Sequence, residues 1–296
     1  MFLKKLCCLV VLVCLYTHTI VAQDSTDIMN QIETAATTTY TTATFKTTRL
    51  ITGQSVENLS AGVLDVRINH RFGALNSGLY NLFGLDNASM RMGFDYGITN
   101  NVMVGIGRST YQKTFDAFIK IKILRQSTGA VNMPITLSYV PNIAVNSLKQ
   151  FTTPKPAFGN RVSYVQQLII GRKMSKNLSL QIMPTFIHHD NISFTHTKQN
   201  SFVIGVGGRQ KISKRVTINA EYYYQLESTK SPNATNVLSL GFDIETGGHV
   251  FQLHFTNSAG MTEKSFISET TGRWDKGDIL FGFNISRVFT IKKRKL

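Results

Sequence analysis

Histidines are the side chains in this sequence best suited to chemistry. His188, His189 and Asp190 are adjacent and His196 follows, a grouping that could suggest a metal site. Neighbouring residues of a strand point to opposite faces, however, and the ligand spacings of zinc sites are missing. We therefore interpret this stretch as a polar surface loop, and the sequence predicts neither a metal site nor a cofactor.

His254 and His70 are the two candidates for a general base. His254 lies between Gln252 and Thr256, on the polar phase of a predicted strand. In a hydrolase such a histidine would activate a serine or a water molecule. Nothing marks a partner nucleophile, because the G-x-S-x-G motif does not occur. The sequence predicts that the protein is not an enzyme and assigns no catalytic residue, with a hydrolase embedded in a barrel as an alternative.

A larger set of charged side chains occupies the polar phase of the predicted strands. Its basic and acidic members are nearly balanced. They could pair into a salt-bridged plug, or form a constriction that selects ions by charge, and both alternatives stay open. The candidate lumen-lining residues are Asp65, Arg67, Arg71, Arg91, Asp95, Asp116, Lys120, Lys122, Arg161, Arg209, Glu221, Asp243, Glu245 and His254.

A second candidate site lies in the predicted loop 259–277. This loop holds the only tryptophan, Trp274, with Arg273 and Lys276 beside it. An aromatic ring flanked by cations suits a sugar or a lipopolysaccharide phosphate, through ring stacking and charge-assisted hydrogen bonds. The alternative is that the loop folds over the mouth of a barrel, with Trp274 packed as a plug.

Period-2 alternation predicts the strands that position these residues. In 278–289, Phe281, Phe283 and Ile285 fall on one face, while Gly282 and Asn284 fall on the other. The length matches the ~9–11 tilted residues with which a strand crosses a bilayer. Eleven further strands are predicted at 62–72, 88–97, 102–110, 114–125, 131–140, 160–171, 178–187, 200–210, 215–226, 236–245 and 249–258.

The lengths of the connections predict the topology. Every second connection is short and made of turn formers, for example 98–101 and 126–130, whereas the others are mostly long. Outer-membrane barrels have short periplasmic turns and longer extracellular loops. The sequence therefore predicts an all-β fold, an antiparallel up-and-down transmembrane β-barrel of about 12 strands. A soluble barrel with its apolar face turned inward is the alternative.

The N-terminus predicts export. Residues 1–22 combine two lysines, an apolar run and a small residue before Gln23, which is typical of a cleaved secretory signal peptide. All three cysteines lie within it. We further predict a threonine-rich periplasmic arm at 23–61, with or without one short strand, the barrel at 62–291 and a basic tail at 292–296. The predicted location is the outer membrane.

The charge of the mature chain predicts its surroundings. Without the signal peptide the chain has 30 basic and 17 acidic residues, a net charge of +13. An exported chain seldom meets nucleic acid, so we expect none as a partner. The expected partners are outer-membrane lipid, lipopolysaccharide and the outer-membrane assembly machinery. The oligomeric state stays open.

Several motifs resemble a known family. They are HRFG at 70–73, DYGITNN at 95–101, KILRQSTG at 122–129, NAEYYY at 219–224, the block 242–261 and FGFNISRVF at 281–289. The chain from about Phe45 onward resembles a family of uncharacterised β-barrel proteins of Bacteroidota, predicted to lie in the outer membrane. The resemblance implies a fold and a location, but no catalytic residue, ligand or substrate.

The sequence predicts a passive function. We expect a narrow channel for small solutes or a structural barrel of the envelope. The alternatives are a barrel-embedded hydrolase, or a surface-binding barrel that holds polyanions or glycans without transporting them.

Overall fold

The structure, a computed structural model, describes residues 37–149, 151, 155, 157–189, 198–247 and 249–292. The predicted signal peptide at 1–22, residues 23–36 of the predicted arm and the tail from 293 lie outside the described residues, as do Asp190 and His196 of the histidine-rich loop. The compact unit that contains the barrel begins at Thr38.

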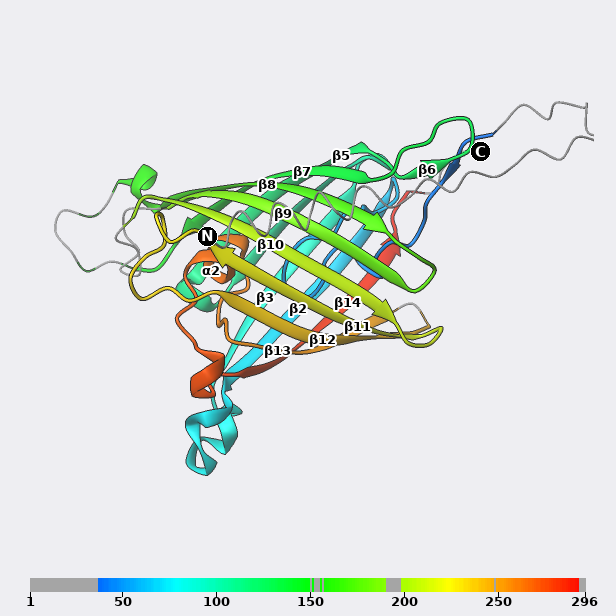
Figure 1. Cartoon of the computed structure of the whole chain (residues 1–296). Helices are drawn as coiled ribbons and strands as arrows, with labels where there is room; N and C mark the ends of the chain where they lie inside the picture. Colours follow the sequence, from blue (N-terminus) through cyan, green and yellow to red (C-terminus); the bar gives the residue numbers. More distant parts are fainter. Residues whose placement is uncertain are drawn as a thin grey trace, which may run out of the picture. The chain divides into compact units, whose positions relative to one another are not determined.

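Twelve strands close into a barrel, as predicted (Figure 1). Each strand pairs antiparallel with its neighbours in chain order, and the last strand closes the ring by pairing with the first of the twelve. The strands are β2 (Val63–Ala74), β3 (Ala88–Gly97), β4 (Val102–Ser109), β5 (Thr114–Leu124), β7 (Thr136–Asn146), β8 (Val162–Lys173), β9 (Leu178–His188), β10 (Asn200–Lys211), β11 (Val216–Gln225), β12 (Val237–Thr246), β13 (His249–Thr256) and β14 (Leu280–Thr290).

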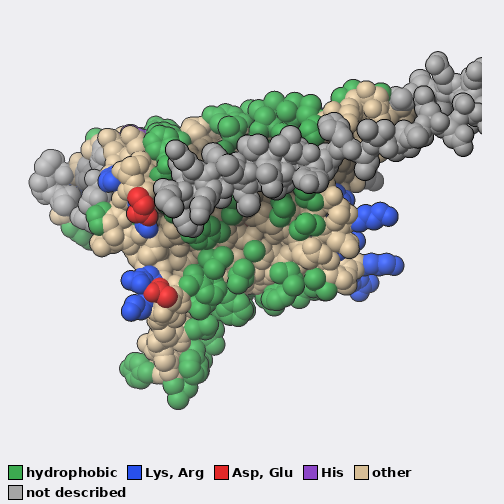
Figure 2. Space-filling model, viewed as in Figure 1, with side chains coloured by type: hydrophobic (Ala, Val, Ile, Leu, Met, Phe, Trp, Pro, Cys, Tyr) green, Lys and Arg blue, Asp and Glu red, His purple; other side chains and the backbone are tan. Residues whose placement is uncertain are grey.

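Burial alternates along the strands with the period of the pleat. In β9, Leu180 and Ile182 are about half exposed, while Gln181 and Met183 are fully buried. Figure 2 shows hydrophobic side chains spread over the outside of the barrel. A wall that exposes its apolar residues outward suits a barrel surrounded by lipid, whereas a barrel in water would turn them inward.

The connections differ between the two ends of the barrel. At the turn end, 98–101, 174–177 and 212–215 are short, but 125–135 is longer and contains β6 (Ser127–Thr128), which pairs with β1 (Thr39–Tyr40). At the loop end lie η2 (Leu75–Ser77), η3 (Leu79–Gly84), η4 (Tyr111–Lys113), η5 (Phe158–Arg161), α2 (Glu263–Ser268) and η6 (Trp274–Lys276). None of the helices in the described ranges is long and apolar enough to cross a membrane.

One strand is displaced from its predicted position. The sequence predicted 131–140, whereas β7 runs from Thr136 to Asn146. Met133 instead forms a bridge to Ser127 in the turn, and Pro134, which has no N–H to donate to a ladder, precedes the strand. The loop that follows is correspondingly shorter than predicted.

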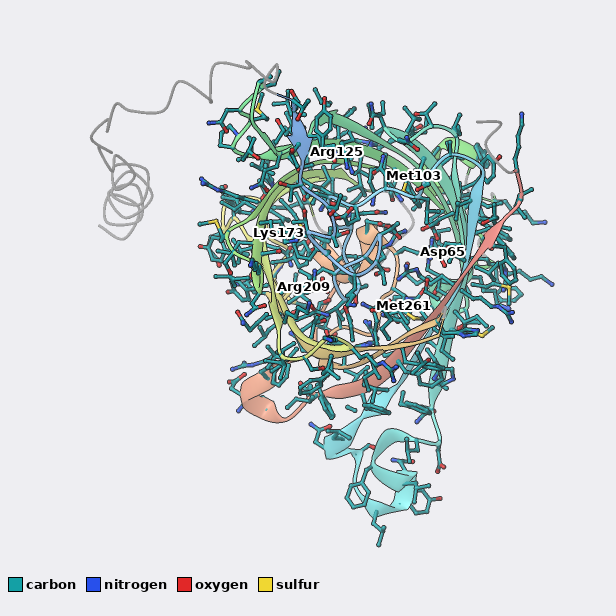
Figure 3. The ribbon with its side chains drawn as sticks, turned by 90° about the vertical axis from the view of Figure 1, so that its right-hand side faces the viewer. Asp65, Met103, Arg125, Lys173, Arg209 and Met261 are labelled. Carbon is teal, nitrogen blue, oxygen red and sulfur yellow. The ribbon has the colours of Figure 1, made fainter. Side chains whose placement is uncertain are left out.

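The largest difference from the prediction is inside the barrel. Residues 44–59, predicted as part of a periplasmic arm, run within the ring of strands instead (Figure 3). They form a hairpin, in which Leu50 N donates to Gly53 O at 2.8 Å and Ser55 N donates to Thr48 O at 3.0 Å. We call residues 44–59 the plug.

The hydrophobic core of the protein therefore lies in the lumen. Leu50 and Val56 of the plug belong to one buried cluster with Phe266 of α2. The wall contributes inward-facing apolar side chains from β4 to β12, namely Met103, Phe118, Val140, Val165, Ile169, Met183, Ile187, Val203, Tyr223 and Val237. The inner surface on this side therefore mixes apolar side chains with polar ones such as Lys120 and Glu221, whereas the sequence predicted a polar lumen wall.

Candidate functional site in the barrel lumen

Lys120 of β5 holds the plug by its backbone. Its ammonium donates to the carbonyls of Thr48 at 3.0 Å, Ser55 at 3.1 Å and Glu57 at 2.9 Å. The side chain is fully buried. An ammonium has three donors and no acceptor, so these three carbonyls use its whole hydrogen-bonding capacity.

Glu221 of β11 makes the opposite contact at the tip of the plug. Its carboxylate accepts the backbone N–H groups of Ile51 at 3.3 Å, Thr52 at 3.0 Å and Gly53 at 3.1 Å. A Cβ atom on Gly53 would lie 1.9 Å from the hydroxyl of Tyr223, so only glycine allows this close approach. Three N–H groups turned toward one carboxylate are a charge-assisted arrangement of the kind that stabilises a buried anion.

Other strands around the ring also donate to backbone carbonyls of the plug. Asn284 of β14 donates to Ile51 O at 2.9 Å, and Gln252 of β13 donates to Leu50 O at 2.9 Å. Gln181 of β9 donates to Gln54 O at 2.8 Å, and Arg209 of β10 donates to Thr44 O at 2.9 Å. Because these strands surround the plug, their contacts fix it inside the lumen rather than against one wall.

Charged side chains of the wall pair with one another and with the plug. Arg91 of β3 forms a two-pronged pair with Asp116 of β5, its Nε donating at 2.9 Å. Arg49 of the plug lies 3.6 Å from Asp95 of the wall and 3.9 Å from Glu263 of α2. Arg49 therefore joins three parts of the chain that are distant in sequence, and the buried guanidinium has a carboxylate on either side of it.

Arg71 makes a second three-way junction. Its guanidinium donates to Ser258 O and Gly260 O of the loop before β14, both at 2.7 Å, and to Thr52 Oγ1 of the plug at 2.9 Å. Its Nη2 also lies 3.1 Å from His254 Nε2. Arginine only donates, so His254 Nε2 is the acceptor and its lone pair is occupied.

The two candidate bases lie on opposite faces of the wall. His70, the other candidate base, faces outward and stacks on Phe283 with ring centroids 5.0 Å apart, on the opposite face of the wall from His254. His189 is buried and its Nε2 lies 2.8 Å from Ser201 Oγ. Within the described ranges, no three metal-binding side chains come together.

The loop between β13 and β14 fills the other end of the lumen. Every residue of α2 is buried, and Lys264 forms an ion pair at 2.9 Å with Glu269, the residue that follows the helix. Phe266 packs edge-on against Tyr223 with ring centroids 5.2 Å apart, and Gln54 Nε2 of the plug donates to Glu263 Oε1 at 2.9 Å. The plug and this loop therefore meet inside the barrel.

The predicted lumen-lining residues fall into two groups. Most are buried side chains of the inner wall: Asp65, Arg67, Arg71, Arg91, Asp95, Asp116, Lys120, Arg209, Glu221, Asp243 and His254. Glu245 lies at the turn end, where it pairs with Lys46. Arg161 is not in a strand but in η5, where it donates to Leu148 O at 3.1 Å, so its placement in the lumen was wrong.

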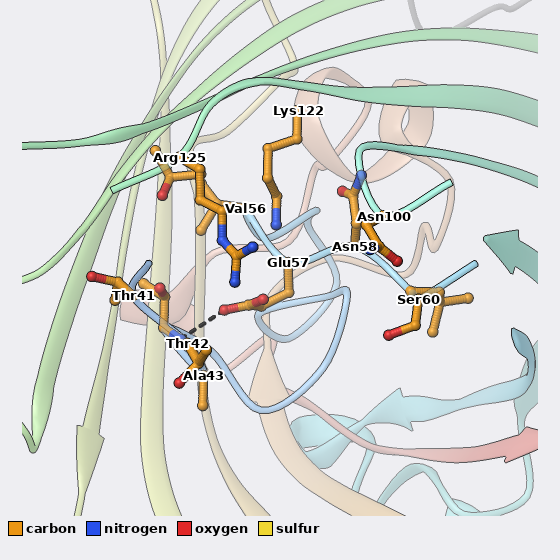
Figure 4. A pocket seen from close by; sticks show the side chains of 13 residues that line it. Thr41, Thr42, Ala43, Val56, Glu57, Asn58, Ser60, Asn100, Lys122 and Arg125 are labelled. Atoms are coloured by element: carbon orange, nitrogen blue, oxygen red, sulfur yellow. Dashed lines mark hydrogen bonds between the residues drawn. The ribbon is translucent and has the colours of Figure 1, made fainter. Parts of the chain in front are cut away.

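Lys122 lies in a polar recess of about 240 Å³ at the turn end (Figure 4). Arg125 and Glu57 point into the same recess. Glu57 itself belongs to the plug, and its Oε1 accepts Thr44 N at 2.6 Å, which joins the two ends of the plug. The recess ends against the plug, so it is a vestibule rather than a passage.

A family comparison agrees with this geometry. The family described as "Membrane bound beta barrel domain (DUF5777)" matches residues 45–289, from the start of the plug to the end of the closing strand. The chain belongs to this family. The resemblance predicted from the motifs is confirmed, and the family boundary includes the plug with the barrel. The search of the curated proteins found no match.

Solved structures with a similar fold include outer-membrane porins and channels. The NanC porin is 11% identical with a TM-score of 0.46, and the comparison covers 78% of this chain and 100% of that chain. The KdgM porin is 8% identical at 0.45, covering 78% and 99%. An outer-membrane channel from Pseudomonas putida F1 is 11% identical at 0.49, covering 79% and 98%. At these values the likeness carries nothing about substrate or transport.

Trp274, the predicted surface-binding residue, contacts strand β12 at the rim of the barrel. Its Nε1 donates to Leu238 O at 2.9 Å, and the ring is half-buried. Arg273 is exposed but paired with Asp275, and this hydrogen bond lowers the pKa of the Asp275 carboxyl. Lys276 is exposed beside them. The indole N–H of Trp274 and the guanidinium of Arg273 therefore already have partners within the chain.

Sequence reasoning missed the plug. Its signal was present in the spacing of large apolar residues through a segment that we took for a solvated arm: Phe45, Leu50, Ile51, Val56 and Leu59. All five are buried. The family resemblance, which begins at Phe45, pointed to the same segment.

Proposed function

We propose that this membrane β-barrel is a closed structural barrel of the outer membrane, not an open channel and not an enzyme. The observation that carries the proposal is the plug, which is hydrogen-bonded to strands around the ring and packed into a hydrophobic core within the lumen. A solute would have to displace this core to pass.

The magnitude of that displacement favours a closed state. Five large apolar side chains of the plug are each at most 8% exposed. Exposing such a side chain to water costs about 1.5–3 kcal/mol. Withdrawing all five would therefore cost roughly 8–15 kcal/mol of hydrophobic free energy, and this range is an upper estimate. Thermal fluctuation would open such a lumen only rarely.

Location and partners follow from the same proposal. The N-terminal pattern supports export through a signal peptide at 1–22, and the apolar outer wall supports insertion into the outer membrane. Lipid and lipopolysaccharide would then surround the barrel, after insertion by the outer-membrane assembly machinery. His254 supports the non-enzymatic proposal, because Arg71 occupies the nitrogen that a general base would use.

Conductance in planar lipid bilayers tests the proposal. We expect the purified full-length mature protein to insert without steady ion conductance, whereas a variant with the plug deleted should conduct if its barrel remains folded. Heat-modifiable migration on gels verifies folding of both proteins. Steady conductance from the unaltered protein would contradict a closed barrel.

A further inference from the structure

The loop between β2 and β3 has a surface that the closed lumen does not explain. Residues 75–85, which we call the apolar finger, carry no charged side chain. Leu79 is 74% exposed and Tyr80 is 95% exposed. The other large apolar side chains of the finger are also exposed: Leu75, Leu82, Phe83 and Leu85. A contiguous apolar surface of this kind marks an interaction site.

The finger is shaped by its backbone rather than by a core of its own. Phe83 N donates to Gly78 O at 2.9 Å, and Leu82 and Phe83 adopt left-handed φ angles of 45° and 54°. Gly84, at φ 90°, packs so closely on Gly73 that a Cβ atom would lie 2.5 Å from that backbone. Strained φ angles in non-glycine residues need support from their surroundings, and here they leave the apolar side chains facing outward.

The finger lies next to the lipid-facing side of the barrel wall. Figure 1 shows it continuing from β2 and β3 at the loop end, and Figure 3 shows it outside the ring of strands. At its base the outward-facing Phe72 stacks on Phe281 with centroids 5.8 Å apart, and Phe281 lies 5.5 Å from Phe255. The finger therefore extends beside the lipid-facing wall and not over the lumen. Figure 2 shows its green side chains continuing those of the wall.

We infer that the apolar finger inserts into the lipid leaflet next to the loop end and anchors the barrel there. The finger lies at the boundary between lipid headgroups and acyl chains. There the ring of Tyr80 can lie in hydrocarbon with its hydroxyl in water. Asn76, at the base, donates to Asp278 Oδ1 at 2.7 Å and fixes the finger to the barrel rim. This anchor is independent of whether the lumen conducts.

Tryptophan fluorescence in vesicles tests the inference. In a Trp274→Phe background, Tyr80→Trp places a single tryptophan on the finger, at a site exposed enough to leave folding unchanged. In phosphatidylcholine vesicles we expect its emission to shift to shorter wavelength than in the matched control Glu227→Trp, which lies in a polar loop at the same end. Brominated phosphatidylcholine should quench the finger tryptophan severalfold more than the control.

A different pattern of quenching would contradict insertion of the finger. If acrylamide in water quenches both tryptophans alike and brominated lipid quenches neither, the finger does not enter the bilayer. The inference would then be overturned, leaving a protein partner as the occupant of this surface. Heat-modifiable migration of both variants verifies that the barrels compared are folded.

Discussion

Replacing Lys120 by methionine should release the plug. Methionine keeps most of the length and apolar volume of the lysine but removes its three donors. Thr48 O keeps a second partner, Ser55 N, whereas the carbonyls of Ser55 and Glu57 lose the ammonium. A buried polar group left without a partner costs about 1–3 kcal/mol, and burying methionine instead of an ammonium offsets part of this. We expect plug docking to weaken by about 2–4 kcal/mol.

Limited proteolysis measures this change directly. Arg49 is 4% exposed within the plug, so trypsin can cut after it only when the plug undocks. Cleavage follows the open population when reclosing is fast, and every 1.4 kcal/mol is a factor of ten. Cleavage after Arg49 in the folded barrel should therefore be faster by roughly 30- to 700-fold in Lys120→Met.

Lys122→Met is the matched control for this experiment. Lys122 lies two residues further along the same inward phase of β5, in the recess at the turn end, where its ammonium holds none of the three plug carbonyls that Lys120 holds. Its replacement should change the cleavage rate by less than about threefold. Equal acceleration in the two variants would refute the reasoning, because it would show that Lys120 does not hold the plug.

The remaining predictions concern the wall and the loops. Phe283→Arg should destabilise the barrel by about 2–4 kcal/mol in lipid, measured by urea unfolding, because the residue faces the bilayer. Asn284→Arg should also be destabilising, since Asn284 is buried against the plug, and a mild effect would contradict a filled lumen. Trypsin added to intact cells should cut after the exposed Arg273 but spare the buried Lys264 and the turn residue Lys214. Cleavage at Lys214 with Arg273 protected would invert the topology.

The wall could be predicted from the sequence because local rules determine it. Alternation in the last strand gives the phase of Phe281 and Phe283 directly, and turn residues such as Thr99 and Asn100 mark the strand ends. The twelve-stranded barrel is confirmed on that basis. Only β7 was displaced, where Pro134 and the bridge from Met133 to Ser127 compete with the apolar pattern.

The contents of the lumen could not be predicted in the same way. The contacts of Lys120 with Thr48 and of Glu221 with Thr52 join residues that are 72 and 169 positions apart. The alternation of residues along a strand does not indicate such pairings. A lysine whose ammonium is buried against carbonyls and a lysine that lines an open pore occupy the same phase of the strand. The apolar inner side of β8 did leave a local signal, because Val165 and Ile169 are apolar on the phase opposite to the exposed Leu168.

A disulfide between the plug and the wall tests the account most directly. A Cβ atom built on Gly171 of β8 lies 3.4 Å from Val56 Cβ, close to the ~3.5–4.5 Å separation found in disulfides. The three native cysteines lie within 1–22, so a chain expressed from Gln23 onward with Val56→Cys and Gly171→Cys has no competing thiol. We predict that this pair oxidises nearly completely in the folded barrel. In the control Val56→Cys with Ile170→Cys, where position 170 points to the other face, both thiols should stay free and react with maleimide once the protein is unfolded. Free thiols at both positions of the Val56→Cys and Gly171→Cys protein would show that residues 44–59 do not fill the lumen.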